Sequence, residues 1–384
     1  MHDSWQRPIH VALNAHLLSG DLSYRSAGVH QYISHLLVHL PQAGCRVTAF
    51  VGPRSMPVAQ AFSLHYRRTL WPTHRPAARV LWEQLAQGRA LQAVGADLVH
   101  GPVFVGPLAA PCPVVITVHD LSFLRYPHLF RPANRLYLRL FTRLSVRRAR
   151  RVIAVSNHAA RETVRLLGVA REKLRVVYHG VDPIFRPLPP EEVAAFRARR
   201  GLPERFVLFV GTLEPRKNLV RLIEAFARAG VDAGADLVLV GARGWYDEEV
   251  FAAVERWRLS SRVHFPGYVP NDELPLWYNA AWVFAYPSLY EGFGLPILEA
   301  QACGTPVLTS SVSALPEAAG NGALMVDPYD PEAIADGLHR LLTDRMLREE
   351  LRQRGLEHAT RFSWARTAAE TVAVYQEAIA GGKP

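Results

Sequence analysis

The chain is 384 residues long, 49% of them hydrophobic, and carries a formal net charge of +10. This length exceeds that of one ordinary domain and predicts two, and the apolar content excludes an intrinsically disordered chain. The three cysteines, Cys45, Cys112 and Cys303, have no metal-ligand spacing to histidine, so neither a disulfide framework nor a zinc site is expected. The first twenty residues lack an apolar stretch long enough for a signal peptide or a membrane span, so we expect a cytoplasmic protein.

Short runs rich in Val, Ile, Leu and Phe alternate along the chain with longer segments whose apolar residues have helical spacing. This alternation is typical of α/β folds. In the first half, strands are predicted at residues 9–14, 46–51, 98–100, 114–119, 151–155 and 174–178. In the second half, they are predicted at residues 206–210, 236–240, 263–265, 282–286, 306–309 and 323–326. Two such sets fit two doubly wound, Rossmann-like domains that face a cleft.

The segment 133–150 of the first half predicts a strongly basic helix. At 3.6 residues per turn its arginines fall within about 120° of one another, with Leu136 and Leu140 among them. These arginines are Arg135, Arg139, Arg143, Arg147 and Arg150. Residues 1–183 hold 23 Lys and Arg against 8 Asp and Glu, a balance of +15. We therefore expect reversible attachment to the anionic inner face of a membrane, with a core-packed helix and a solvated arginine face as the alternative.

Glycine and proline interrupt the pattern at residues 180–190, which predicts a linker. The charge changes sign there, since residues 184–384 hold 21 basic against 26 acidic side chains. We therefore predict an N-terminal domain at residues 1–183 and a C-terminal domain at residues 184–362. A last helix is expected from residue 363 to the end.

Ligands of open α/β sheets bind beyond the carboxyl ends of the strands, so the residues after each run are the candidate site residues. The first strand predicted in the second half is followed by Gly211 and Thr212 and then by the cations Arg216 and Lys217. Asn218 precedes apolar residues at helical spacing and is predicted to cap a helix. An anion bound here would meet free backbone amides, the positive end of a helix dipole and two charges. The segment therefore predicts a phosphate site.

A second segment places Glu291 on a glycine-containing loop and Glu299 eight residues later, within a predicted helix. Glycine lets a ligand approach the backbone closely. Two carboxylates also allow a glycoside hydrolase, which needs them roughly 5–10 Å apart, but a hydrolase leaves the cationic segment unexplained. Carboxylates that bind sugar or ribose hydroxyls, beside cations that bind phosphate, favour a sugar nucleotide as the ligand.

The first half offers two weaker candidates, His119 and Gly28. His119 follows a predicted strand that is apolar on both faces, so it should lie at the ligand edge of the sheet. Gly28 either opens a helix towards a phosphate or is a turn glycine. No G-x-G-x-x-G follows the first predicted strand, which argues against an NAD-dependent oxidoreductase. No D-x-D triplet occurs either, so no metal cofactor is expected and the cations would have to neutralise a diphosphate.

Together these segments resemble glycosyltransferase family 4, a retaining family with the GT-B fold, over nearly the whole chain. Residues 291–300 are similar to the family's E-x7-E element, and residues 211–218 resemble its diphosphate loop. The segments 119–122 and 179–182 also match, although many members have Asn at the position of His179. Residues 24–29 resemble a loop of bacterial mannosyl- and rhamnosyltransferase-like members.

The resemblance implies a role for each candidate residue. Arg216 and Lys217 would neutralise the leaving diphosphate, and Glu291 would orient the donor sugar. His119 would contact that sugar from the first domain, and Glu299 would bind the ribose. The remaining donor contacts would come from Gly28, Gly211, Thr212, Phe293, Gly294, Leu295, Tyr268 and Val269. The last helix would pack back onto the first domain.

The implied activity is the retaining transfer of a hexose, with GDP-mannose as the favoured donor, to a glycan or lipid-linked acceptor on the side of the first domain. Retention in this family is thought to need no enzymatic nucleophile. Two alternatives stay open. A sugar-nucleotide epimerase of the same fold would consume no acceptor, and a nucleic-acid-binding protein would use the basic half. The second alternative leaves the E-x7-E segment unexplained, so no nucleic acid partner is expected.

Overall fold

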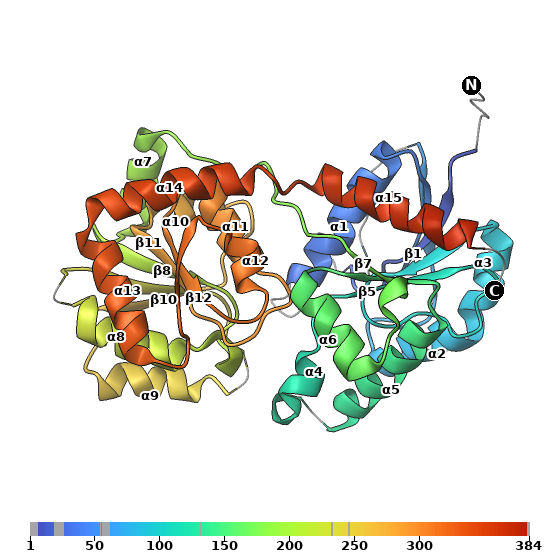
Figure 1. Ribbon diagram of the computed structural model, residues 1–384, viewed down its shortest axis with the longest axis horizontal. Helices are drawn as coiled ribbons and strands as arrows, with labels where there is room; N and C mark the ends of the chain where they lie inside the picture. Colours follow the sequence, from blue (N-terminus) through green and yellow to red (C-terminus); the bar gives the residue numbers. More distant parts are fainter. Residues whose placement is uncertain are drawn as a thin grey trace. The chain divides into compact units, whose positions relative to one another are not determined.

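The computed structural model describes residues 7–18, 27–53, 55, 62–130, 132–231, 233–244 and 246–381. The chain forms two compact units: one contains Met1–Gly180 and Trp364–Pro384, and the other contains Val181–Ser363. Each unit has its own parallel sheet flanked by helices (Figure 1). Both units are Rossmann-like, as the alternation of strands and helices predicts.

The first unit is built on a seven-stranded parallel sheet in the order β3-β2-β1-β4-β5-β6-β7. Its strands are β1 (His10–Asn14), β2 (Arg46–Val51), β3 (Leu64–Arg68), β4 (Leu98–Gly101), β5 (Val114–Val118), β6 (Arg151–Ala154) and β7 (Leu174–Val176). β1, β4 and β5 are buried along their whole length, as expected of central strands in a parallel sheet. The strand order reverses between β1 and β4, so a ligand is expected beyond the carboxyl ends of these two strands.

The helices of the first unit include the last helix of the chain. They are α1 (Ala27–Gln42), α2 (Pro76–Leu81), the π-helix Trp82–Ala86, α3 (Gln87–Val94), α4 (Ser122–Arg125), α5 (Pro132–Arg148), α6 (Asn157–Leu167) and α15 (Trp364–Ala380). α15 packs on α1 and β6, and its Tyr375 hydroxyl lies 2.7 Å from Nδ1 of His100 on β4. The return of the last helix to the first unit (Figure 1) confirms the prediction.

Two elements of the first unit differ from the prediction. β3 pairs with β2 at the sheet edge, but only one of its five residues is buried, so it carries no apolar run that the sequence could reveal. Helix α5 ends at Arg148, and the Arg150 amide instead donates to the Val114 carbonyl in the sheet. The prediction that Arg150 belongs to the basic helix is therefore wrong.

The second unit contains a six-stranded parallel sheet in the order β10-β9-β8-β11-β12-β13. Its strands are β8 (Phe206–Val210), β9 (Asp236–Val240), β10 (Val263–Gly267), β11 (Val283–Tyr286), β12 (Val307–Ser310) and β13 (Ala323–Val326). Its helices are α7 (Pro190–Arg200), α8 (Leu219–Ala229), α9 (Glu248–Arg256), α10 (Leu274–Ala280), α11 (Leu295–Ala302), α12 (Leu315–Ala319), α13 (Pro331–Thr343) and α14 (Arg345–Ala359). The order reverses between β8 and β11, so the loops after these strands are the expected ligand loops.

The chain leaves the first unit after Gly180 and returns to it at Trp364. The Val181 amide donates to the Phe362 carbonyl, and Val181 forms an isolated parallel bridge with Ser363. The two ends of the second unit are therefore hydrogen-bonded to each other.

Candidate active site

Two glycine loops pack together at the ligand edge of the second sheet. Gly211, after β8, and Gly241, after β9, have φ angles of +154° and +150°. The Gly211 amide donates to the Val240 carbonyl, and the Leu213 amide donates to the Ala242 carbonyl. A Cβ on Gly241 would overlap the carbonyl oxygen of Gly211. Glycine is therefore required at this close contact, which fixes the start of the predicted phosphate segment.

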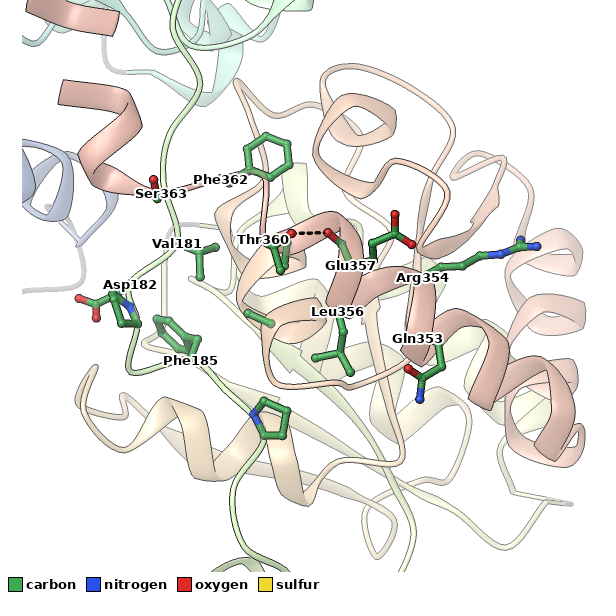
Figure 2. Close-up of a pocket in the computed structure, with 14 residues that line it drawn as sticks. Val181, Asp182, Phe185, Gln353, Arg354, Leu356, Glu357, Thr360, Phe362 and Ser363 are labelled. Atoms are coloured by element: carbon green, nitrogen blue, oxygen red, sulfur yellow. Dashed lines mark hydrogen bonds between the residues drawn. The ribbon is translucent and has the colours of Figure 1, made fainter. Parts of the chain in front are cut away.

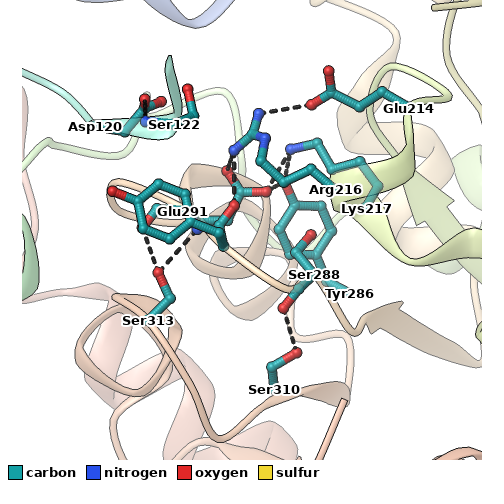
Figure 3. Close-up of polar contacts among 11 residues, drawn as sticks. Asp120, Ser122, Glu214, Arg216, Lys217, Tyr286, Ser288, Glu291, Ser310 and Ser313 are labelled. Carbon is teal, nitrogen blue, oxygen red and sulfur yellow. Dashed lines mark hydrogen bonds and ion pairs between the residues drawn. The ribbon is translucent and has the colours of Figure 1, made fainter. Parts of the chain in front are cut away.

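Arg216 and Lys217 lie in the 3-10 turn Pro215–Lys217, just before α8. Both bind one carboxylate: Arg216 Nη1 lies 2.9 Å from Glu291 Oε2, and Lys217 Nζ lies 2.6 Å from Glu291 Oε1 (Figure 3). Lys217 and Glu291 are both buried. The structure thus brings the two predicted cations and the predicted sugar-binding carboxylate into one group, here called the ion cluster.

Two residues that the sequence reading misses, Glu214 and Tyr286, complete the ion cluster. Arg216 Nη2 donates to Glu214 Oε1 at 2.7 Å, and Lys217 Nζ donates to the Tyr286 hydroxyl at 2.6 Å. Two cations therefore face two carboxylates. The available signal for Glu214 is its place next to the cations in sequence, and that for Tyr286 is its position at the end of β11.

Mutual attraction keeps the ion cluster charged. Burial raises the pKa of Glu291, but Arg216 and Lys217 outweigh that effect and lower the pKa to about 2. Burial lowers the pKa of Lys217, but the charge of Glu291 outweighs it and the net shift is upward. Burial, and then the charge of Glu291, raises the pKa of Tyr286 to about 12. The carboxylate and the ammonium group therefore stay ionised at neutral pH, and the phenol stays protonated.

Asn218 precedes α8 as predicted, but its side chain does not cap the helix. Its backbone is left-handed, with φ +62°, and Nδ2 donates to the carbonyls of Pro287 and Pro328. Oδ1 accepts from Arg221. The predicted N-cap position of Asn218 is therefore confirmed, but its side chain ties the start of α8 to two neighbouring loops instead of capping the helix.

The loop that carries Glu291 is held by Ser313 (Figure 3). The Ser313 hydroxyl accepts from the Glu291 amide at 3.0 Å and donates to the Glu291 carbonyl at 2.7 Å. Phe293 is buried, Gly294 has φ +129°, and Leu295 begins α11. The first amides of a helix have no partner within the helix, so this turn can bind an anion.

Glu299 lies on α11, where it is buried and accepts a hydrogen bond from the Tyr278 hydroxyl at 2.8 Å. Burial raises the pKa of Glu299 to about 7. The two carboxylates of the E-x7-E segment thus differ, because Glu291 is held ionised by two cations, whereas Glu299 accepts from a phenol and the charge of Asp182 adds to the effect of burial on its pKa. Near neutral pH Glu299 can accept or donate a hydrogen bond with a ligand hydroxyl.

The other predicted donor contacts of the second unit follow its strands. Thr212 is half-buried in the loop after β8. Tyr268 and Val269 follow β10, with the Tyr268 side chain exposed and the Val269 side chain buried. The ring of Tyr268 is therefore accessible, whereas Val269 exposes little of its side chain, and the donor contacts of both residues remain predictions.

The first unit holds His119, which follows β5. Its Nε2 lies 2.8 Å from the Pro102 carbonyl oxygen. Because a carbonyl only accepts, Nε2 carries the proton and Nδ1 keeps its lone pair. Burial lowers the pKa of His119, so the ring is neutral at neutral pH. The ring stacks on His179, with centroids 5.4 Å apart.

Gly28 also belongs to the first unit and lies in the first turn of α1. Among the described residues, no atom outside its own helix backbone and its chain neighbours lies within 4 Å of the position where a Cβ would stand. Tyr24, Arg25 and Ser26, from the loop that resembles mannosyl- and rhamnosyltransferase-like members, lie outside the described residues. The predicted position of Gly28 at a helix start is thus confirmed, and its predicted contact with a diphosphate remains a prediction.

An open groove of about 720 Å³ lies elsewhere in the second unit (Figure 2). It runs between segment 181–187 and the end of α14, and most of its lining is apolar, including Phe185, Leu356 and Phe362. None of the predicted site residues lines this groove. The candidate site is therefore defined by its polar groups and not by the size of a cavity.

In the described part of the chain, no three His, Cys, Asp or Glu side chains are grouped so that they could hold a metal ion. Among the helices of these residues, none is long and apolar enough to cross a membrane.

The second unit thus places two cations and a helix start, which are groups suited to phosphate, beside carboxylates, which are groups suited to hydroxyls, at the switch point of a Rossmann-like sheet. With two such units and a returning last helix, these features define a glycosyltransferase of the GT-B type.

Comparison with known proteins identifies the family. The model of Glycosyltransferase Family 4 matches residues 26–185, and that of glycosyl transferases group 1 matches residues 192–358. The O-antigen chain mannosyltransferase B of Escherichia coli is 32% identical over 335 residues, which cover 86% of this chain and 83% of that protein. A D-inositol 3-phosphate glycosyltransferase of Streptomyces bingchenggensis is 35% identical over 311 residues, which cover 74% of this chain and 67% of that protein. The chain belongs to glycosyltransferase family 4.

Solved structures agree in fold. Sucrose-phosphate synthase from Thermosynechococcus elongatus matches with a TM-score of 0.77 at 23% identity, over 97% of this chain and 100% of that one. HepE from Anabaena, in complex with UDP and glucose, matches with a TM-score of 0.72 at 20% identity, over 96% of this chain and 98% of that one. These matches show that the fold is GT-B.

Proposed function

We propose that this glycosyltransferase moves a hexose from a nucleotide-diphosphate sugar, with retention of configuration and without a metal ion. The ion cluster of Arg216, Lys217 and Glu291 is the observation that carries the proposal. When the bond between the sugar C1 and the phosphate oxygen breaks, its electron pair moves to the diphosphate. Cations that their neighbours already hold in place stabilise this growing charge without reorganising.

In the proposed reaction the acceptor oxygen bonds to C1 on the face from which the diphosphate leaves, and its proton passes to the departing phosphate oxygen. No side chain acts as a nucleophile. The lone pair on His119 Nδ1 would accept a hydrogen bond from a sugar hydroxyl, and Glu299 would bind a ribose hydroxyl. Gly28 and the first amides of α11 would contact the diphosphate.

We infer GDP-mannose as the donor and a glycan or lipid-linked glycan as the acceptor. The name of the Escherichia coli relative supports mannose, whereas the HepE complex supports a nucleotide sugar with a different base and sugar. Thermal unfolding in the presence of GDP-mannose, UDP-glucose, UDP-galactose and dTDP-rhamnose tests the donor. A ligand at about 100 times its Kd adds about 2.7 kcal/mol of stability. A rise in unfolding temperature with UDP-glucose alone would identify that nucleotide as the donor in place of GDP-mannose. If none of the four raised the unfolding temperature, the proposed function would be refuted.

We further propose that α5 attaches the first unit to an anionic membrane. Arg135, Arg139, Arg143 and Arg147 are exposed on this helix. Leu136, Leu140 and Leu144 are 66%, 50% and 36% exposed at a spacing of four residues. Leucines that interrupt the basic arc in the sequence can therefore insert among lipid headgroups while the arginines bind anionic lipid.

Co-sedimentation with vesicles tests this attachment. Binding to vesicles with anionic lipid should be strong at low salt and should weaken as salt shortens the Debye length. Leu140→Ser and Arg139→Ala should each reduce binding, while Arg345→Ala, at an exposed arginine of the second unit, should not. Equally weak binding to neutral and anionic vesicles at low salt would contradict the proposal.

A further inference from the structure

A small polar pocket, of about 40 Å³, lies in the first unit where the strand order reverses between β1 and β4. Asn14 and His16 reach it from the end of β1, Glu83 from the π-helix, and Phe104 from the loop after β4. Tyr137 of α5 also lines it, so α2 with its π-helix and α5 lie side by side here (Figure 1). Such a volume holds a few water molecules or the hydroxyl edge of a larger ligand.

Three buried polar atoms of this pocket have no hydrogen-bond partner among the described residues: Nδ1 and Nε2 of His16, and Oε2 of Glu83. The two residues are only 5% and 4% exposed. Unpaired buried polar atoms destabilise a protein, and native structures keep few of them. Asn14, by contrast, is hydrogen-bonded to Gln87. The pocket therefore contains unused hydrogen-bonding capacity in a position where parallel sheets bind ligands.

The backbone around the pocket is unusual in two places. Glu83 belongs to the π-helix Trp82–Ala86, and such insertions are frequent at functional sites. Phe104 has φ +54°, a left-handed conformation that is an outlier for a bulky residue and is found where function requires it. Trp82 meets the His16 ring edge-on, with centroids 4.5 Å apart, and so orients the imidazole.

The lining selects a neutral ligand with hydroxyl groups. A carboxylate at Glu83 accepts from a hydroxyl, and the neutral imidazole of His16 donates from one nitrogen and accepts at the other. Arg79 opposes a metal cation, and Glu83 opposes a phosphate. Sugars combine hydroxyl edges with apolar C–H faces, and the apolar lining for such a face consists of Leu17, Val103, Phe104, Val105 and Leu138.

Phe104 also connects the pocket with His119. The two rings meet edge-on with centroids 6.1 Å apart. In the proposed function His119 contacts the transferred sugar, so a ligand against Phe104 lies beside the reacting centre. Resting on that function, we propose that the pocket of His16, Glu83 and Phe104 binds the terminal sugar of the acceptor, and that Glu83 selects the configuration of its hydroxyls.

Binding of simple sugars to the full chain tests this proposal. Methyl glycosides of mannose, glucose, galactose and rhamnose are titrated against the wild type, Glu83→Gln and His16→Phe, and GDP-mannose affinity is measured in parallel. We expect one glycoside to bind the wild type, and Glu83→Gln to weaken it by about tenfold or more, the effect of losing a charged hydrogen bond. Donor affinity should stay unchanged. Glu172→Gln, at an exposed glutamate of the same unit, is the matched control and should change neither affinity.

A pH series adds a readout that a structural role for Glu83 would not move. Burial raises the pKa of Glu83 to about 7, against the opposing charge of Arg79. The other titratable groups that line the pocket stay neutral, since burial lowers the pKa of His16 to about 3 and raises that of Tyr137 to about 12. Glycoside affinity of the wild type should therefore rise with pH between 6 and 8, and that of Glu83→Gln should not.

Two results would overturn the proposal. One is unchanged glycoside affinity in both variants, and the other is a wild type that binds a donor but none of the glycosides; either would leave the pocket as a site for structural water. Failure of every sugar nucleotide to bind would instead refute the proposed function. If Glu83→Gln does not fold, His16→Phe, which keeps an aromatic ring against Trp82, decides the question.

Discussion

In the second unit the charged groups of the site bind one another, whereas in the first unit three buried polar atoms of the pocket, on His16 and Glu83, have no hydrogen-bond partner among the described residues. Arg216, Lys217 and Glu291 are compensated before any ligand arrives. In the proposal for the pocket, both nitrogens of His16 and Oε2 of Glu83 gain partners when a sugar binds. A compensated cluster is held in place before any ligand binds, while buried polar atoms without a partner destabilise the free protein and gain on binding. Under the proposed function, the ion cluster of the second unit stabilises the leaving group and the pocket of the first unit selects the acceptor.

The largest effect should follow from loss of a cation in the ion cluster. Arg216→Ala should lower kcat by roughly 100-fold or more, because the charge that it stabilises develops during bond breaking. Donor binding should suffer less. Steady-state kinetics with Arg345→Ala as the control measure the effect. Near wild-type turnover in both Arg216→Ala and Lys217→Ala would remove the diphosphate role.

A pair of aromatic substitutions should move stability in opposite directions. Tyr286→Phe removes a hydroxyl that binds Lys217 and should destabilise the second unit by about 1–2 kcal/mol. His16→Phe replaces two unpaired nitrogens by carbon and should leave the first unit unchanged or more stable by up to about 1 kcal/mol. Urea unfolding checks both. An equal loss of unfolding free energy in the two variants would mean that the nitrogens of His16 are hydrogen-bonded as well as the hydroxyl of Tyr286 is.

The two carboxylates of the E-x7-E segment should respond to pH with opposite signs. The pKa of Glu291 is lowered to about 2, so its stabilisation is present above the ordinary pKa near 4.5 and is lost as pH falls towards 2. The pKa of Glu299 is raised to about 7, so its ionisation destabilises the fold as pH rises from about 4.5 to 7. Each effect is on the order of 3 kcal/mol.

Urea midpoints between pH 3.5 and 8 test this difference. Glu291→Gln should lose most stability relative to the wild type at neutral pH and less in acid. Glu299→Gln should gain relative to the wild type as pH rises through 7. If the difference in urea midpoint from the wild type changed with pH in the same way for both variants, the environments of Glu291 and Glu299 would not differ as described.

The smallest effect should come from chelation. Because the two cations are proposed to neutralise the diphosphate, EDTA treatment should leave transfer unchanged within error. A requirement for added Mg²⁺ or Mn²⁺ would assign charge stabilisation to a metal instead.

The sequence predicts the strands of both sheets well, because central strands of a parallel sheet are apolar on both faces. β3 escapes this criterion, since it is an edge strand with mostly exposed side chains. The ion cluster is predictable in part: Arg216, Lys217 and Glu291 are recognisable in the sequence. Glu214 and Tyr286 join them only in the fold, and Tyr286 does so from the end of strand β11. The side-chain contacts of Asn218 are not predictable, because Oδ1, the atom that would cap the helix, accepts from Arg221, while Nδ2 donates to two carbonyls of other loops.

The pocket of the first unit is not predictable from local patterns. His16 and Glu83 are 67 positions apart in the numbering and belong to no shared motif. Only the sheet topology places the end of β1 next to the loop after β4, and only the π-helix directs a glutamate into that space. A single buried carboxylate on an irregular helix leaves no periodic signal in the sequence.

The return of α15 to the first unit also constrains how the chain is made. Residues from Trp364 onward complete a core that begins near the N-terminus, since Tyr375 is fully buried and meets His100 on β4. On the ribosome the second unit is synthesised whole before the first can close. Until α15 emerges, the nascent first unit exposes the apolar surface that this helix later covers. Premature termination before Trp364 would therefore yield a protein prone to aggregation and degradation, even though every residue of the ion cluster is present.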